Sequence, residues 1–340
     1  MNIQNDRFTE LTVRYKDLRI AVIGDFCLDR YLEIDPELKE PSLETGLDVY
    51  NVVNVRSQPG GAGTILNNLV ALGIGKIVPI GFYGADGEGY ELYNSLSSLK
   101  NVDLNYFLKT HLRRTFTYCK PLLMLKGKPP EELNRLDFKN WTPTPQDVEG
   151  KIIDYISEVL KNCDAAVVLE QVDIANTGVI TKNVLKKIGE FSSQNPDLPI
   201  IADSRRGLKD YPPLIYKMNI NELYKLVGRE IRLEIQEIRD TALQLSGKTG
   251  RLVFVTMGER GMVGVDNSGR TYYQPALPPR GEIDIVGAGD AVTANLISAL
   301  SAGATMAESL ELATAAAFVV IHKLGTTGTA SIEEISSVLF

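Results

Sequence analysis

Cysteine and histidine are scarce in this sequence. Its 340 residues include three cysteines and two histidines, scattered without a CxxC pair or a Cys/His cluster. A structural zinc site is therefore not expected, and such unpatterned cysteines fit the reducing cytoplasm. Long apolar runs are also missing, because no stretch reaches the roughly 18 residues of a membrane span and the first residues have no apolar core of signal-peptide length. We therefore expect a cytoplasmic protein without membrane contact.

Positive charge is in short supply as well. The formal net charge is -7, so a general affinity for nucleic acid or for an anionic membrane is not expected. The hydrophobic content of 44% is sufficient for a large buried core. Any phosphate ligand must be held by local features, such as backbone N–H groups, a metal ion or a few basic side chains.

Short apolar runs alternate with helical patterns along most of the chain. This alternation predicts a single α/β domain over residues 1–340, with a mainly parallel central sheet flanked by helices. The expected strands cover residues 19–23, 76–81, 165–169, 200–202, 252–256 and 262–265. The expected helices cover residues 61–72, 89–98, 147–160, 177–192, 222–227, 230–245, 290–302 and 306–324.

Two β-rich stretches interrupt this alternation. Residues 47–55 and 113–125 have strand composition but no helical pattern after each strand. They predict antiparallel strands outside the main sheet, in a small β lid inserted at about 30–58 and 103–125. Residues 126–145 contain several Pro and Gly and predict a loop. Because exposed strands readily pair with another chain, we expect a homodimer that forms through the lid.

The stretch DIVGAGD at residues 284–290 precedes a helical pattern with one apolar face. A glycine turn at a helix start leaves backbone N–H groups unpaired beside the positive end of the helix dipole, which makes an anion site. Asp290 at its edge could accept a hydroxyl proton, as phosphoryl transfer to an alcohol requires. A plain strand-to-helix turn explains the same residues. The stretch is neither a Walker P-loop nor a GxGxxG fingerprint, and no GxGxxG follows the first strand, which disfavours a dinucleotide oxidoreductase.

Three motifs in sequence order resemble those of one enzyme family. They are GDFCLDRY at residues 24–31, QPGGAG at 58–63 and DIVGAGD at 284–290. Together they resemble the motifs of the ribokinase-like sugar kinases, also named the phosphofructokinase-B family, over nearly the whole chain. The resemblance implies a ribokinase-like three-layer fold and ATP-dependent phosphorylation of a sugar or sugar-phosphate hydroxyl. It also implies Mg²⁺ and a monovalent cation such as K⁺.

The resemblance implies roles for individual residues. Asp290 would deprotonate the acceptor hydroxyl, while the backbone amides of Gly287, Ala288 and Gly289 would hold the transferring phosphate. Asp284 would help bind the monovalent cation. The residues implied to contact the sugar are Asp25, Asp29, Gly60, Gly61 and Asn68. Glycines let the backbone approach a polar ligand, and carboxylates accept hydrogen bonds from hydroxyls.

Asn219 and Glu222 lie three residues apart at the start of an expected helix. The spacing is that of a capping box, which needs no ligand. The family carries Asn-x-x-Glu here in association with Mg²⁺ and phosphate, although it usually has Pro where this chain has Met218. Both interpretations stay open, and Glu222 is a predicted magnesium ligand that acts through water.

Two further segments resemble the family's nucleotide-binding loops. Thr256, Gly258 and Gly261 follow an apolar strand, although a hairpin turn explains them as well. Lys323 and Gly325 follow an alanine-rich helix and could close over the nucleotide, although a helix C-cap at Gly325 explains them nearly as well.

Basic residues mark two other places. Arg113 and Lys120 belong to the lid segment RRTFTYCK at 113–120. One face of that segment could hold a substrate phosphate, or its charges could only protect an edge strand. The stretch DSRR at 203–206 follows an expected strand, at the carboxyl end of the sheet where ligands tend to bind.

Within the family, the chain is most similar to kinases that act on heptose 7-phosphate. GDFCLDRY, PGGAGTILNN, RRTFTYCK and KLGTTGT carry this similarity. The chain departs from that subgroup at Thr64, where Asn is usual, and at residues 170–178, where no lysine is present to meet a phosphate. A ribose, fructose or nucleoside kinase, or a non-catalytic sugar or nucleotide sensor on the same fold, remains an alternative.

Overall fold

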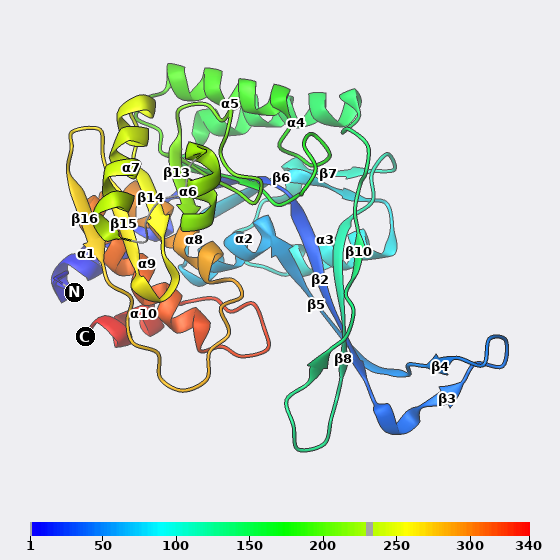
Figure 1. Ribbon diagram of the computed structural model, residues 1–340. Helices are drawn as coiled ribbons and strands as arrows, with labels where there is room; N and C mark the ends of the chain where they lie inside the picture. Colours follow the sequence, from blue (N-terminus) through cyan, green and yellow to red (C-terminus); the bar gives the residue numbers. More distant parts are fainter. Residues whose placement is uncertain (1, 229–233) are drawn as a thin grey trace.

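A mainly parallel sheet runs through the centre of the molecule (Figure 1). The computed structural model describes residues 2–228 and 234–340. The strands of the large sheet are β1 (Arg19–Gly24), β6 (Lys76–Gly84), β7 (Phe107–Thr110), β11 (Ala165–Glu170), β12 (Ile200–Ser204), β13 (Ile215–Asn219), β14 (Val253–Thr256), β15 (Met262–Val265) and β16 (Thr271–Gln274). The nine strands lie in the order β16-β15-β14-β13-β12-β11-β1-β6-β7. Neighbouring strands are parallel except where β15 pairs with β14 and β16.

Helices cover both faces of this sheet. One face packs against α1 (Asn5–Arg14), α2 (Ala62–Ala71), α3 (Gly87–Ser97), α8 (Ala288–Ser301), α9 (Met306–Ile321) and α10 (Ile332–Leu339). The other packs against α4 (Gln146–Val159), α5 (Lys182–Gln194), α6 (Ile220–Val227) and α7 (Ile235–Thr249). Alternate residues of β1 enter the two cores, because side chains of a strand point to opposite faces. The predicted α/β fold with three layers is confirmed.

A second, smaller sheet forms the lid and extends away from the body of the molecule (Figure 1). Its strands are β2 (Phe26–Ile34), β5 (Val52–Gly61), β8 (Phe116–Leu123), β9 (Glu131–Glu132) and β10 (Leu136–Phe138). They lie in the order β10-β8-β2-β5, with β9 paired to β8. A short pair, β3 (Glu40–Pro41) and β4 (Asp48–Val49), lies between β2 and β5 in the chain.

Three expectations about the lid are corrected. The segment 113–125 was expected to be antiparallel; β8 is antiparallel to β9 and β10, but it runs parallel to β2. The second lid insertion was expected from 103, but β7 pairs with β6 in the large sheet. The expected loop 126–145 contains β9 and β10, which its Pro and Gly content concealed.

Several element boundaries also differ from the sequence expectation. The helix expected from residue 177 begins at Lys182, because Thr181 caps it and residues 177–180 form a loop. The helix expected to reach 324 ends at Ile321, so Gly325 is not its C-cap. Of the helix expected over 230–245, residues 230–233 lie outside the described residues, and α7 continues to Thr249.

The alternation of apolar runs and helical patterns did not predict several elements, namely α1, α10, β7, β13 and β16. In β13 the charged side chain of Lys217 breaks the apolar run that would have revealed a buried strand. Over residues 2–228 and 234–340, the structure contains no helix that is both long and apolar enough to cross a membrane.

Candidate active site

The start of α8 provides an anion-binding turn. Gly287 is the N-cap residue and has a left-handed φ of 83°. A methyl group at this position would lie 2.5 Å from Cγ2 of Thr327, so both the conformation and the space favour glycine. No side chain of the described residues caps this helix end. The N–H of Ala288, one of the three amides predicted to hold the phosphate, instead donates to the carbonyl of Ile285 at 3.3 Å. The remaining first-turn N–H groups are available to an anion.

Asp290 lies in the first turn of α8 and is half-buried. Burial raises the pKa of its carboxyl group to about 7, the charge of Lys217 opposes the rise, and the charges of Asp203 and Asp29 add to it. A carboxylate with a pKa near neutrality is suited to accept a proton and release it again.

A buried ion pair supports the turn from beneath. Lys217 on β13 lies 2.6 Å from Oδ2 of Asp203 on β12, and Thr293 donates to the same oxygen at 3.2 Å. Burial alone would lower the pKa of Lys217, but the contact with Asp203 outweighs it and the pKa is raised. A methyl group at Gly289 would lie 3.2 Å from Nζ of Lys217. A permanent positive charge therefore lies beside the anion turn.

Asp29 on β2 faces the same space as Asp290. Its pKa is raised by burial, while the charges of Lys120, Arg135 and Arg205 act in the opposite direction. A methyl group at Gly60 would lie 2.7 Å from Oδ2 of Asp29. The paired glycine on β5 therefore leaves room for this carboxylate, and the structure brings Asp29 and Gly60 together at the base of the lid.

Asp25 is placed differently from Asp29. It is fully buried between β1 and β2, and its carboxylate accepts hydrogen bonds from the backbone N–H groups of Gln171 at 2.8 Å, Val172 at 3.2 Å and Val179 at 2.6 Å. Burial raises its pKa to about 6, and these N–H groups oppose the rise. The geometry makes Asp25 an anchor for the loop 171–179 and does not support the expected sugar contact.

Gly61 and Asn68 also serve the framework. A methyl group at Gly61 would lie 2.5 Å from the carbonyl oxygen of Asp25, so this glycine allows close chain packing. Asn68 is fully buried; it donates to the carbonyl of Thr64 at 3.0 Å and accepts from the N–H of Ala330 at 3.4 Å. Asn68 links α2 to the C-terminal segment and has no side-chain group turned to the site.

The two basic residues expected in the lid are separated. The guanidinium of Arg113 donates to Oγ1 of Thr142 at 3.0 Å and to the carbonyl of Pro143, so it is occupied outside the site. The ammonium group of Lys120 on β8 lies 4.9 Å from the centre of the Tyr31 ring, and its charge opposes the rise that burial causes in the pKa of Asp29. Lys120 therefore faces the site and Arg113 does not.

On the side where the nucleotide is expected, Asn219 and Glu222 form a complete capping box on α6. The N–H of Glu222 donates to Oδ1 of Asn219 at 3.0 Å, and the N–H of Asn219 donates to Oε2 of Glu222 at 2.8 Å. Thr256 donates to the carbonyl of Met218 at 3.4 Å. A short turn at Gly258–Arg260 joins β14 to β15, so the hairpin interpretation of this segment is confirmed.

The C-terminal loop closes the site from another side. Lys323 is occupied by the carbonyl of Thr329 at 2.7 Å and by Glu334 at 2.6 Å, so it is not free for a nucleotide. Gly325, with a φ of 69°, turns the chain within this loop. Thr326 donates to Gln58 of β5 at 3.0 Å, which joins the loop to the base of the lid.

Metal-binding capacity on the protein side is small. Among residues 2–228 and 234–340, no three His, Cys, Asp or Glu residues gather closely enough to hold a metal ion. Glu222 is half-buried near Lys217, and burial raises its pKa. Asp284 accepts from the N–H of Val286 at 3.0 Å at the start of the anion turn. Either carboxylate fits a single contact to a cation whose other ligands are phosphate oxygens and water.

Sequence reasoning missed Lys217 and Arg135 as site residues. The charge of Lys217 inside an otherwise apolar stretch was a usable signal, because a buried lysine needs a partner. Arg205 belongs to the DSRR stretch already noted at the carboxyl end of a strand. Arg135 lies 4.9 Å from the ring of Tyr118, within a segment expected to be a loop.

Comparison with known proteins agrees with this arrangement. The model of the pfkB family carbohydrate kinases matches residues 18–333. The chain belongs to the pfkB family of carbohydrate kinases. It is thus a sugar kinase by family, as the three motifs indicated.

The pfkB family relatives include bifunctional proteins. HldE of Hyphomonas neptunium is 29% identical over 98% of this chain and 66% of that protein. HldE of Trichlorobacter lovleyi is 28% identical over 96% of this chain and 64% of that protein. The chain therefore spans slightly less than two thirds of the length of these relatives.

Solved pfkB-like structures share the fold at low identity. Arabidopsis thaliana ribokinase complexed with ribose and ATP has a TM-score of 0.69 and 18% identity, covering 95% of this chain and 98% of that one. Escherichia coli phosphofructokinase-2 in complex with fructose-6-phosphate has a TM-score of 0.67 and 18% identity, covering 94% and 98%. The same enzyme in complex with potassium has a TM-score of 0.69 and 17% identity, again covering 94% and 98%.

Proposed function

We propose that this kinase transfers the terminal phosphate of ATP to a hydroxyl of a sugar phosphate of the heptose 7-phosphate type. The observation that carries the proposal is the start of α8. Its glycine turn has no side-chain cap, and it lies beside Asp290, whose carboxyl group has a pKa of about 7. A carboxylate beside an anion turn can hold an acceptor hydroxyl and a phosphate next to each other.

Each step of the proposed reaction uses a group of this chain. Asp29 accepts a hydrogen bond from an acceptor hydroxyl and orients the sugar. Asp290 takes the proton of the acceptor hydroxyl. The hydroxyl oxygen then forms a bond to the terminal phosphorus of ATP, and the bond from that phosphorus to the leaving ADP oxygen breaks. The amides of Gly287 and Gly289 and the charge of Lys217 stabilise the negative charge of the transferring group.

Mg²⁺ would supply charge neutralisation of the nucleotide phosphates, with Glu222 as its contact through water. Asp284 would hold a monovalent cation beside the turn, and a potassium complex is known for phosphofructokinase-2. Both assignments rest on single carboxylates at the edge of the site.

A phosphate on the acceptor is supported by basic residues at the lid. The charges of Lys120, Arg135 and Arg205 all reach Asp29, and Arg135 stacks on Tyr118 beside it in the sheet. Arg135 is already paired with Asp137 at 2.6 Å, so Lys120 and Arg205 are the cations left to meet a substrate phosphate. An uncharged ribose, fructose or nucleoside acceptor would leave the charges of Lys120 and Arg205 unused.

The deciding experiment measures ADP release from ATP and Mg²⁺ with the purified chain over a panel of sugars and sugar phosphates. We expect turnover with a heptose 7-phosphate, and lower turnover with the same sugar without phosphate. Turnover of unphosphorylated sugars alone would reject the phosphate on the acceptor. Saturable sugar binding without ADP release under any condition would instead support the sensor.

We also propose a homodimer through the lid. Val53 and Val55 on β5 and Leu136 on β10 are 54%, 47% and 56% exposed. The strand register places Val55 and Leu136 on the face of the lid opposite to Asp29. The inner face would then serve the acceptor and the outer face a second copy of the chain. The three free cysteines and the use of ATP favour a cytoplasmic location.

A further inference from the structure

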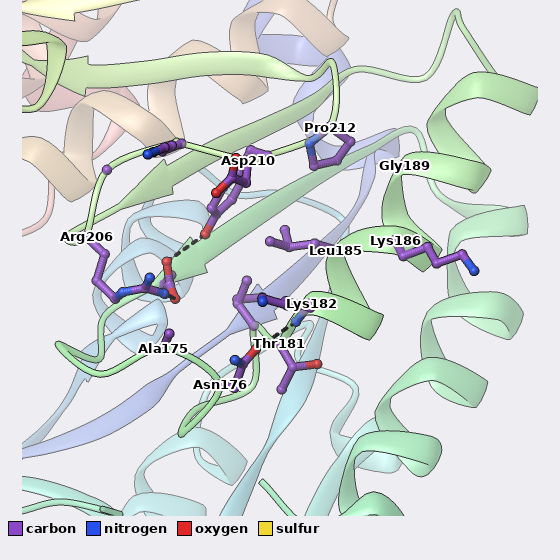
Figure 2. Close-up of a pocket in the computed structure, with 15 residues that line it drawn as sticks. Ala175, Asn176, Thr181, Lys182, Leu185, Lys186, Gly189, Arg206, Asp210 and Pro212 are labelled. Carbon is purple, nitrogen blue, oxygen red and sulfur yellow. Dashed lines mark hydrogen bonds and ion pairs between the residues drawn. The ribbon is translucent and has the colours of Figure 1, made fainter. Parts of the chain in front are cut away.

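A cavity lies outside the candidate active site. It measures about 480 Å³ and opens where the start of α5 faces the loop after β12 (Figure 2). We term it the α5 pocket; its floor is Glu170 and its walls come from residues 175–189 and 206–212. None of the predicted site residues lines it. Its size is that of a site for a small molecule.

The lining of the α5 pocket has an excess of positive charge. Four basic side chains face two acidic ones. Glu170 is only 1% exposed and is already neutralised by Arg206 at 2.6 Å. Across residues 2–228 and 234–340, neither Lys182 nor Lys209 has an ion-pair partner. The charges of the lining that have no ion-pair partner are therefore mainly positive. Asp210 at the rim is the negative charge that Arg206 does not neutralise.

The floor of the pocket is rigid. The carboxylate of Glu170 accepts hydrogen bonds from Ser204 at 2.6 Å, from Arg206 at 2.6 Å and from Tyr211 at 3.0 Å. This network ties β11, β12 and the following loop together. Only one guanidinium nitrogen of Arg206 is used in this pair, so the remaining nitrogens can meet a ligand.

The walls of the pocket are shaped by the backbone. Asn176 and Asp210 stand on opposite walls, and both have left-handed backbone conformations, with φ of 62° and 66°. The side chain of Asn176 accepts from the N–H of Lys182 at 3.0 Å, which fixes the entry to α5 (Figure 2). The dipole of this 13-residue helix adds to the positive field of the lysines.

We propose that the α5 pocket binds a small phosphate monoester and couples its binding to the loop that Asp25 anchors. Arg206, Lys182 and Lys209 supply the donors for the phosphate. Ile180, Leu185 and Pro212 supply an apolar surface for the body of the ester. The pocket is therefore a binding site separate from the one that holds the reacting groups.

The coupling follows from shared chain segments. The loop 171–179 is fastened to Asp25 through the N–H groups of Gln171 and Val179, and its other end enters the wall of the α5 pocket. Arg206 follows Arg205, whose charge acts on Asp29. In the proposal, an anion bound by the remaining nitrogens of Arg206 acts on the loop 171–179 and on Arg205, which contact or approach the acceptor site from two sides.

The test measures binding directly and does not depend on the proposed kinase activity. The whole chain is titrated calorimetrically with inorganic phosphate, a hexose 6-phosphate and AMP, so that a free anion, a sugar ester and a nucleotide are distinguished. Amide hydrogen exchange locates the site. We expect an ester to bind more tightly than inorganic phosphate and to protect residues 175–182 and 206–212.

The double variant Lys182→Gln, Lys209→Gln removes two of the three lysine charges of the pocket, leaves Lys186 in place, and does not touch the Glu170 network. Both side chains are exposed, so the fold is expected to persist. We expect at least ten-fold weaker ester binding, with binding unchanged in the control Lys151→Gln on the neighbouring helix α4. Equal weakening in the control, protection confined to residues 284–290, or no saturable binding by any probe would overturn the proposal. Binding that leaves exchange in 171–179 unchanged would reject the coupling.

Discussion

The carboxyl group of Asp290 combines a half-buried position with a place in the first turn of a helix. We predict that Asp290→Asn retains ATP binding and lowers turnover by roughly 10²–10⁴, because the acceptor proton has no base to receive it. This corresponds to about 3–5 kcal/mol of barrier. Steady-state kinetics and calorimetry check it, with Asp147→Asn in the first turn of α4 as the matched control. Near-normal turnover would remove Asp290 from the mechanism.

The same residue predicts a pH dependence. A base works only when deprotonated, and burial raises the pKa of Asp290 to about 7. We expect kcat/KM to fall about ten-fold for each pH unit below about 7 and to level off above it. The pH profile of the wild-type chain measures this limb. Asp290→Asn should lack it, and an identical limb in that variant would assign the titration to another group.

At the scale of elements, Asp25 and Asp29 differ in role although they lie four residues apart. Asp25 satisfies three buried backbone N–H groups of the loop 171–179. We predict that Asp25→Asn destabilises the fold, since each buried donor without an acceptor costs roughly 1–3 kcal/mol. Urea unfolding measures the loss, and hydrogen exchange in 171–179 should rise.

Asp29→Asn is the matched comparison. It should leave the free energy of unfolding nearly unchanged and raise the KM of the acceptor, because Asp29 faces the site. If Asp25→Asn instead changed acceptor KM without loss of stability, the anchor role of Asp25 would be wrong.

The capping box on α6 yields another prediction at this scale. Asn219→Ala should lower stability by about 1 kcal/mol, whereas Asn219→Ser keeps the cap and most of the stability. If the motif also serves the nucleotide, Asn219→Ser will still raise the KM for ATP and Mg²⁺. Thermal unfolding and kinetics of both variants separate the two roles, and normal ATP kinetics in Asn219→Ser would leave only the cap.

At the scale of the whole molecule, the outer face of the lid predicts the assembly. Charge placed on that face should oppose its burial. We predict that Val55→Lys with Leu136→Lys converts a dimer into a monomer in light scattering coupled to gel filtration. Exposed Tyr272→Lys on β16, at the edge of the large sheet and outside the lid, is the control. A monomeric wild-type chain would refute the dimer.

The fold and the site were predictable to different degrees. The alternation of patterns predicted the α/β layers, because burial on both faces imposes apolar runs on parallel strands. The glycine turn before Asp290 was visible because helix starts have local chemistry. The sequence could not show that Asp25, Asn68 and Arg113 have structural roles while Asp29 and Lys120 face the site. The hydrogen-bond partners of the first three lie far away in sequence.

The sequence alone determined the layer architecture, the position of the anion turn and the family of this chain, because the apolar patterns and motifs that indicate them are each short and local. Only the tertiary structure decided which carboxylates face the site, that β8 runs parallel to β2, and that Lys217 lies beside the turn. Strand pairing and burial set those features, and both arise from contacts between segments that local pattern does not connect.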